Sequence, residues 1–96
     1  MIVHIVMFLF KDENKSANID ETKKRLEALL GVVPTLKSME VGVNFTESER
    51  AFDLSLYSTF DSKEALNEYA VHPEHLKVVE FIKSVTLQSK VVDYIL

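Results

Sequence analysis

Residues 2–10, IVHIVMFLF, are the stretch that decides the fold. They are rich in β-branched and aromatic side chains, and they are apolar at both odd and even positions apart from His4. A strand with one face in water alternates apolar and polar residues, whereas a strand covered on both faces does not. We therefore predict that residues 2–10 form a strand that is buried on both faces.

A helix and a hairpin are predicted after this strand. Asn18 is positioned to cap a helix in which leucines recur at helical spacing, and Gly31 stands where such a helix would stop. Apolar and polar residues alternate over 38–45 and again over 52–60, with a polar loop at 46–50. This alternation predicts two antiparallel strands joined by that loop.

The last third of the chain predicts two helices and a strand. Asp61 and Glu64 form a capping-box pattern that opens a short helix. Pro73 has a fixed φ and no N–H, so it suits the first position of a second helix. That helix has four apolar residues at core spacing: Leu76, Val79, Ile82 and Val85. Residues 91–96 are predicted to form the final strand.

The predicted order is β-α-β-β-α-β in a single domain, residues 1–96. This order is typical of the α+β ferredoxin-like fold, a four-stranded antiparallel sheet with helices on one face. The other face would be open, yet residues 2–10 and 91–96 carry apolar side chains on both parities. We therefore expect that face to pack on a second copy, which gives a homodimer, a dimeric α+β barrel.

Composition excludes several classes of function. The net charge of −4 without a basic cluster argues against nucleic acid as a partner, and the lack of cysteine excludes disulfides and thiolate chemistry. Residues 2–10 are too short to span a membrane and lack the flanks of a signal peptide, so we expect a cytoplasmic protein with no membrane partner. No phosphate-binding loop occurs, and no cofactor is expected. His72, Glu74 and His75 could be read as metal ligands, but a cap residue does not follow helical geometry and no carboxylate stands at a second matching position, so no metal is expected.

Residues 69–75, YAVHPEH, hold two of the three histidines of the chain. With Pro73 opening a helix, His72 becomes its cap and His75 lies in the first turn. The positive end of a helix disfavours a second positive charge, so we expect the pKa of His75 to be lowered. A neutral His75 could act as a general base, and Tyr69 could donate a hydrogen bond to a carbonyl or enolate oxygen.

Each of these residues also has a structural interpretation. His75 could hydrogen-bond the preceding turn, and Tyr69 could fill the gap between the short helix and the sheet. His4 could be a satisfied core residue or the third wall of a polar pocket that also contains Tyr69 and His75. Asp53 and Asp93 are expected to pair across the dimer interface.

Six short segments occur in one order at compatible spacing. They are His4, Gly42-Val43-Asn44, Ala51-Phe52-Asp53-Leu54, Phe60-Asp61-Ser62, Tyr69 to His75, and Val92-Asp93-Tyr94. Together they resemble the stress-responsive A/B barrel domain (Dabb) family over essentially the whole chain. The resemblance implies a ferredoxin-like fold and homodimers formed through the sheets. It also implies diverse functions, from stable stress-associated plant oligomers to one plant polyketide cyclase.

The resemblance to that cyclase implies catalytic roles for Tyr69 and His75 and a pocket role for His4. Leu54 stands where the cyclase has a further histidine, so we expect a different substrate and pocket polarity. Two hypotheses follow. In the first, a small apolar carbonyl-type ligand binds between sheet and helices, with cyclase-like acid/base chemistry. In the second, the protein is a non-catalytic, stable oligomer with a stress-related or accessory role.

Overall fold

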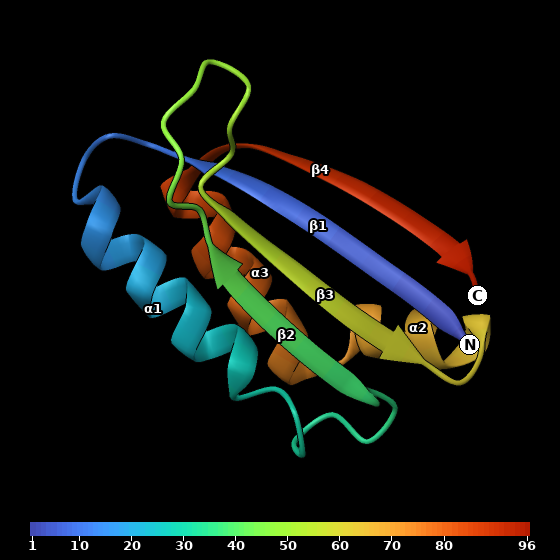
Figure 1. Ribbon diagram of the computed structural model, residues 1–96. Helices are drawn as coiled ribbons and strands as arrows, with labels where there is room; N and C mark the ends of the chain where they lie inside the picture. Colours follow the sequence, from blue (N-terminus) through green and yellow to red (C-terminus); the bar gives the residue numbers. More distant parts are fainter.

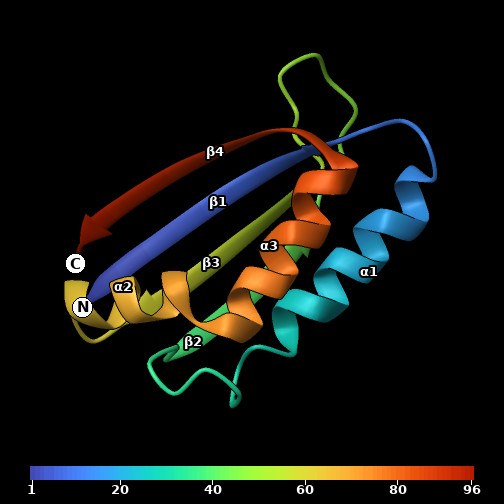
Figure 2. The same cartoon turned by 180° about the vertical axis from the view of Figure 1, so that it is seen from behind.

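The computed structural model describes residues 1–96 and has the predicted β-α-β-β-α-β order, with the second helical unit split in two. The elements are β1 (Ile2–Phe10), α1 (Lys15–Glu27), β2 (Ser38–Val43), β3 (Leu54–Phe60), α2 (Lys63–Val71), α3 (Pro73–Val85) and β4 (Thr86–Ile95). The strands form one antiparallel sheet in the order β2-β3-β1-β4. The helices lie behind this sheet in Figure 1 and in front of it in Figure 2. No helix has the length and apolar character that a membrane crossing needs.

The hydrophobic core lies between the sheet and the helices. Its 14 buried apolar residues come from every helix, from β1, β2 and β3, and from the segment between α1 and β2, but none comes from β4. Phe60 and Leu26, for example, are 0% and 1% exposed. The helix-facing side of β4 is therefore left uncovered by the core, and this space becomes important for the site.

The opposite side of β1 is apolar as well, as predicted. Val3 is completely buried yet does not belong to the core cluster, because alternate residues of a strand point to opposite faces. On the same open face Ile5 lies between Tyr57 of β3 and Val92 of β4. Tyr57 and Val92 are 36% and 52% exposed. An apolar patch therefore lies on the sheet face that Figure 1 presents to the viewer.

The predicted boundaries of α1 are wrong. The helix begins after Asn14, whose φ of 52° is left-handed, and Asn18 lies inside it with its amide donating to the carbonyl of Glu13. Asparagine is one of the few residues that adopt this conformation readily, so the chain turns at Asn14. The helix also ends at Glu27, short of Gly31.

Three strand boundaries and one helix face also differ from prediction. β3 starts at Leu54 rather than at residue 52. β2 ends at Val43, and Phe45 is 97% exposed in the loop that follows. β4 is longer than residues 91–96 because it starts directly after α3 and pairs along the whole of β1. Leu76, expected in the core, is 51% exposed on the outer side of α3.

The cap of α2 lies one residue later than predicted. The hydroxyl of Ser62 accepts a hydrogen bond from the backbone N–H of Ala65 at 3.1 Å, which is the usual N-cap contact. Asp61 instead pairs with Lys37 at 3.0 Å. The start of the helix was therefore predicted in the right region, but its cap was placed one residue too early.

Candidate functional site

A cavity of about 280 Å³ lies between the sheet and α3. Its volume is near the lower end of small-molecule pockets. His4 from β1, Tyr69 from α2 and His75 from α3 all line it, so the fold brings together the three residues selected from the sequence. Its other walls are mainly apolar and include Val6, Phe8, Leu26, Leu56 and Ile82.

The junction between α2 and α3 positions His75. As predicted, Pro73 is the first residue of α3 and His72 is its cap, with Nδ1 of His72 accepting a hydrogen bond from the N–H of Glu74 at 3.1 Å. His72 has ψ of 134°, the extended conformation that a following proline favours. The chain therefore turns sharply at His72, and the first turn of α3 carries His75 to the cavity.

His75 has one nitrogen bound and one free. Nδ1 lies 3.0 Å from the carbonyl oxygen of Ala70, which can only accept, so Nδ1 carries the proton and Nε2 of the neutral ring has a lone pair. The pKa of His75 is lowered, as predicted, but burial is the main cause rather than the helix terminus. The bond to Ala70 opposes the shift, and the charges of His4 and His72 add to it.

Tyr69 lies against His75. Their ring centroids are 4.1 Å apart and Tyr69 is 2% exposed, with Phe60 on its other side at 5.1 Å. Burial raises the pKa of the phenol, so Tyr69 keeps its proton and remains a hydrogen-bond donor. Among the side-chain polar atoms that are inaccessible to solvent, only the hydroxyls of Thr22 and Thr35 lack a hydrogen-bond partner. The Tyr69 hydroxyl, which has no partner in the chain, therefore borders open space.

His4 is hydrogen-bonded within its own chain. It lies directly opposite Asp93 in the β1–β4 register, and its Nδ1 contacts the Asp93 carboxylate. Asp93 is expected from the sequence to pair across the dimer interface, and in the single chain its partner is His4. Asp53 also has partners within the chain, because its carboxylate accepts from the N–H of Phe10 at 2.8 Å and pairs with Lys15 at 3.3 Å.

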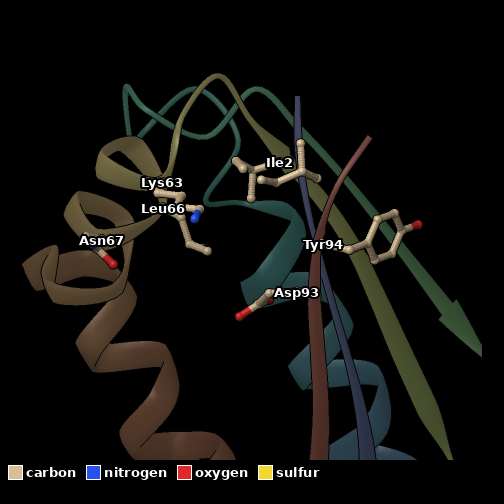
Figure 3. A pocket seen from close by; sticks show the side chains of 7 residues that line it. Ile2, Lys63, Leu66, Asn67, Asp93 and Tyr94 are labelled. Carbon is tan, nitrogen blue, oxygen red and sulfur yellow. The ribbon is translucent and has the colours of Figure 1, made fainter.

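A second pocket, of about 530 Å³, lies on the other side of the His4–Asp93 pair. Figure 3 shows Lys63, Leu66 and Asn67 of α2 on one side of it and Asp93 of β4 facing them. Because Asp93 lines this pocket and His4 lines the smaller cavity, the contact between the two residues lies where the two pockets adjoin. The smaller cavity remains the candidate site because the buried Tyr69 and the half-buried His75 line it.

Side chains that could have filled the cavity lie elsewhere. Leu54 is buried in the core but does not line the cavity, and neither do Leu76 and Phe81. The ring of Phe81 instead lies under the guanidinium of Arg25, 4.0 Å away. The cavity is therefore open rather than occupied by its own walls.

Sequence reasoning missed the polar residues at the other end of the cavity. Lys83, Thr86 and Ser89 line it there. A signal was available for one of them, because His75, Val79 and Lys83 recur at a spacing of four residues and so lie on one stripe of α3.

The architecture defines the class of protein: a ferredoxin-like α+β fold with a cavity between sheet and helices and an uncovered apolar sheet face. The chain belongs to the Stress responsive A/B Barrel Domain (Dabb) family, whose model matches residues 2–96. It is similar to a dimeric protein of unknown function and ferredoxin-like fold from Bacteroides fragilis. The two share 31% identity with a TM-score of 0.88, over 97% of this chain and 93% of that one.

Two plant relatives differ in length and in what is known of them. A stress-response A/B barrel domain-containing protein of Arabidopsis thaliana is 36% identical over 80 residues, which are 83% of this chain. The chain spans only 30% of the length of that Arabidopsis protein. Olivetolic acid cyclase of Cannabis sativa is 26% identical over 97% of this chain and 94% of its own length.

Proposed function

We propose that the chain forms a homodimer through its open sheet face and binds a small apolar molecule with a carbonyl group in the cavity. We propose in addition that Tyr69 and His75 carry out acid/base chemistry on that molecule and that His4 shapes the pocket. The observation that carries this proposal is the unpartnered Tyr69 hydroxyl beside His75 in a mainly apolar cavity. Similarity to olivetolic acid cyclase and to a dimeric relative supports it.

The simplest reaction that this pair supports is proton transfer next to a carbonyl group. The Tyr69 hydroxyl donates a hydrogen bond to the carbonyl oxygen while Nε2 of His75 takes a proton from the adjacent carbon. The electron pair of that C–H bond forms a carbon–carbon double bond, and the negative oxygen of the resulting enolate is stabilised by Tyr69. His75 then returns a proton to carbon, and no cofactor is needed. Cyclase-like chemistry would begin with the same enolate.

Deuterium exchange tests both the site and the reaction. A linear methyl ketone is incubated in deuterated water with wild type, Tyr69→Phe, His75→Ala or the control Tyr57→Phe, and α-proton exchange is followed by NMR. We expect wild type and the control to exchange the ketone, and Tyr69→Phe to be slower by about a hundredfold. Circular dichroism confirms that each variant is folded. Equal affinity for the ketone in wild type and both site variants would exclude the proposed site.

A non-catalytic, stable oligomer with a stress-related or accessory role is the second candidate. Two contacts favour it: the bond from His75 to Ala70 joins α3 to α2, and the His4–Asp93 pair joins β1 to β4. In that case His75→Ala, which removes the bond to Ala70, would lower the free energy of unfolding, and no ketone would bind to wild type.

A further inference from the structure

The cavity is elongated along α3. His75 lines one end and Lys83 the other, and eight residues of helix separate them, which corresponds to about 12 Å. The sheet gives the same span, because His4 and Phe8 line the cavity four residues apart on β1, or about 13 Å. Figure 2 shows α3 running from its junction with α2 to the start of β4. A ligand held by Tyr69 would therefore extend toward Lys83.

Lys83 is the only permanent charge in the lining. No aspartate or glutamate lines the cavity, since Asp93 belongs to the neighbouring pocket. The ammonium group of Lys83 makes no hydrogen bond or ion pair within the chain. Ser89, directly opposite Phe8 in the sheet, adds a hydroxyl at the same end.

The usual role of a lysine in the last turn of a helix is already filled by other residues. Such a lysine commonly bonds the terminal carbonyl groups. Here the side chain of Lys11 donates to the carbonyl of Ser84 at 3.1 Å. The backbone N–H of Lys11 donates to the carbonyl of Val85 at 2.9 Å. The hydroxyl of Thr86 donates to Ile82 at 2.8 Å. Lys83 is therefore free to bind something else.

We propose that Lys83 is the anion-binding residue of the cavity and that the ligand is a linear oxo acid. Its carbonyl oxygen lies at Tyr69, its apolar chain lies along Val6, Phe8 and Ile82, and its carboxylate pairs with Lys83. The methylene stem of lysine can lie on the apolar wall while the ammonium stays at the mouth. This inference rests on the proposed function, because it assigns the far end of the ligand that Tyr69 and His75 bind.

The test compares two ligands that differ in charge and by one methyl group. A linear oxo acid whose functional groups match the span of about 12 Å and its methyl ester are titrated into the protein by calorimetry. The variants are wild type, Lys83→Met and the control Lys24→Met, which removes an exposed lysine of α1 away from the cavity. We expect wild type and the control to bind the acid about tenfold more tightly than the ester. Lys83→Met should lose this preference while its affinity for the ester is unchanged.

Two outcomes would overturn the inference. Wild type could bind acid and ester equally, or Lys83→Met could keep the preference for the acid. If Tyr69→Phe still weakens both ligands in these cases, the proposed function stands and only the anion site fails. If neither ligand binds to wild type, both proposals fail together.

Discussion

The two ring nitrogens of His75 have different tasks. Nδ1 holds the end of α2 through Ala70, whereas Nε2 is left with a lone pair beside Tyr69. The structural and the chemical interpretations of this residue are therefore compatible, because each uses a different atom. The Ala70 contact also selects the tautomer that a general base needs.

Acid should destabilise the protein through His75. Its pKa in the folded chain is below the ordinary 6.5, so the unfolded state binds the proton more tightly. The free energy of unfolding should therefore fall as the pH drops through 6.5 toward the lowered value. We expect wild type to lose more stability than His75→Gln between about pH 8 and pH 5, measured by urea unfolding. An NMR titration that placed His75 at or above 6.5 would contradict the prediction.

The junction between α2 and α3 determines where His75 lies in the site. The side chain of Ser62 caps the start of α2, and at its end the backbone N–H of His72 donates to Tyr69 while the His72 side chain caps α3. Because His75 lies three residues after the cap, the direction of the first turn of α3 decides whether His75 meets Tyr69. A proline at the first helical position makes that direction rigid.

Removing the His72 cap should loosen this junction. His72→Ala leaves the N–H of Glu74 without its acceptor, and the loss of such a cap costs about 1 kcal/mol of stability. His72→Asn supplies a side-chain acceptor again and should stay near wild type. The measurement is the urea midpoint of each variant at one protein concentration. A loss in His72→Asn as large as in His72→Ala would show that the cap is not the cause.

At the scale of the whole molecule, the sheet separates two surfaces with different roles. The cavity lies on the helix side, where β4 contributes nothing to the core, and the apolar patch around Ile5 lies on the other side. A dimer formed through the open face would therefore leave the cavity accessible. It would also cover Val92 and Tyr57, which are exposed in the single chain.

A charge on the open face should dissociate the proposed dimer. Val92→Glu places a carboxylate beside Ile5, where the second copy would remove it from water. Leu76→Glu is the matched control, because Leu76 is 51% exposed on α3 and Val92 is 52% exposed on the sheet. We expect a monomeric mass for Val92→Glu and a dimeric mass for the control in light scattering at micromolar concentration. A monomeric wild type would refute the dimer itself.

Local patterns predicted most of the fold but not all of its limits. The strand at residues 2–10 and the α3 cap followed from side chains adjacent in sequence. The starts of α1 and β4 did not, because the left-handed turn at Asn14 and the full pairing of β4 with β1 depend on how the chain packs. The prediction that Phe45 belongs to a strand was wrong for a related reason. Apolar and polar residues continue to alternate past Val43, but β3 starts only at Leu54, so Phe45 has no strand partner.

The sequence predicts the order of elements, the split helix and the three candidate residues, since these depend on periodicity and on neighbouring side chains. Only the tertiary structure decided that His4, Tyr69 and His75 line one open cavity. It also decided that Asp93 pairs with His4 and that Lys83 lies at the far end. These contacts join residues far apart in the chain. Their geometry depends on the sheet register and on the angle at which α3 packs, and neither is encoded in any short segment.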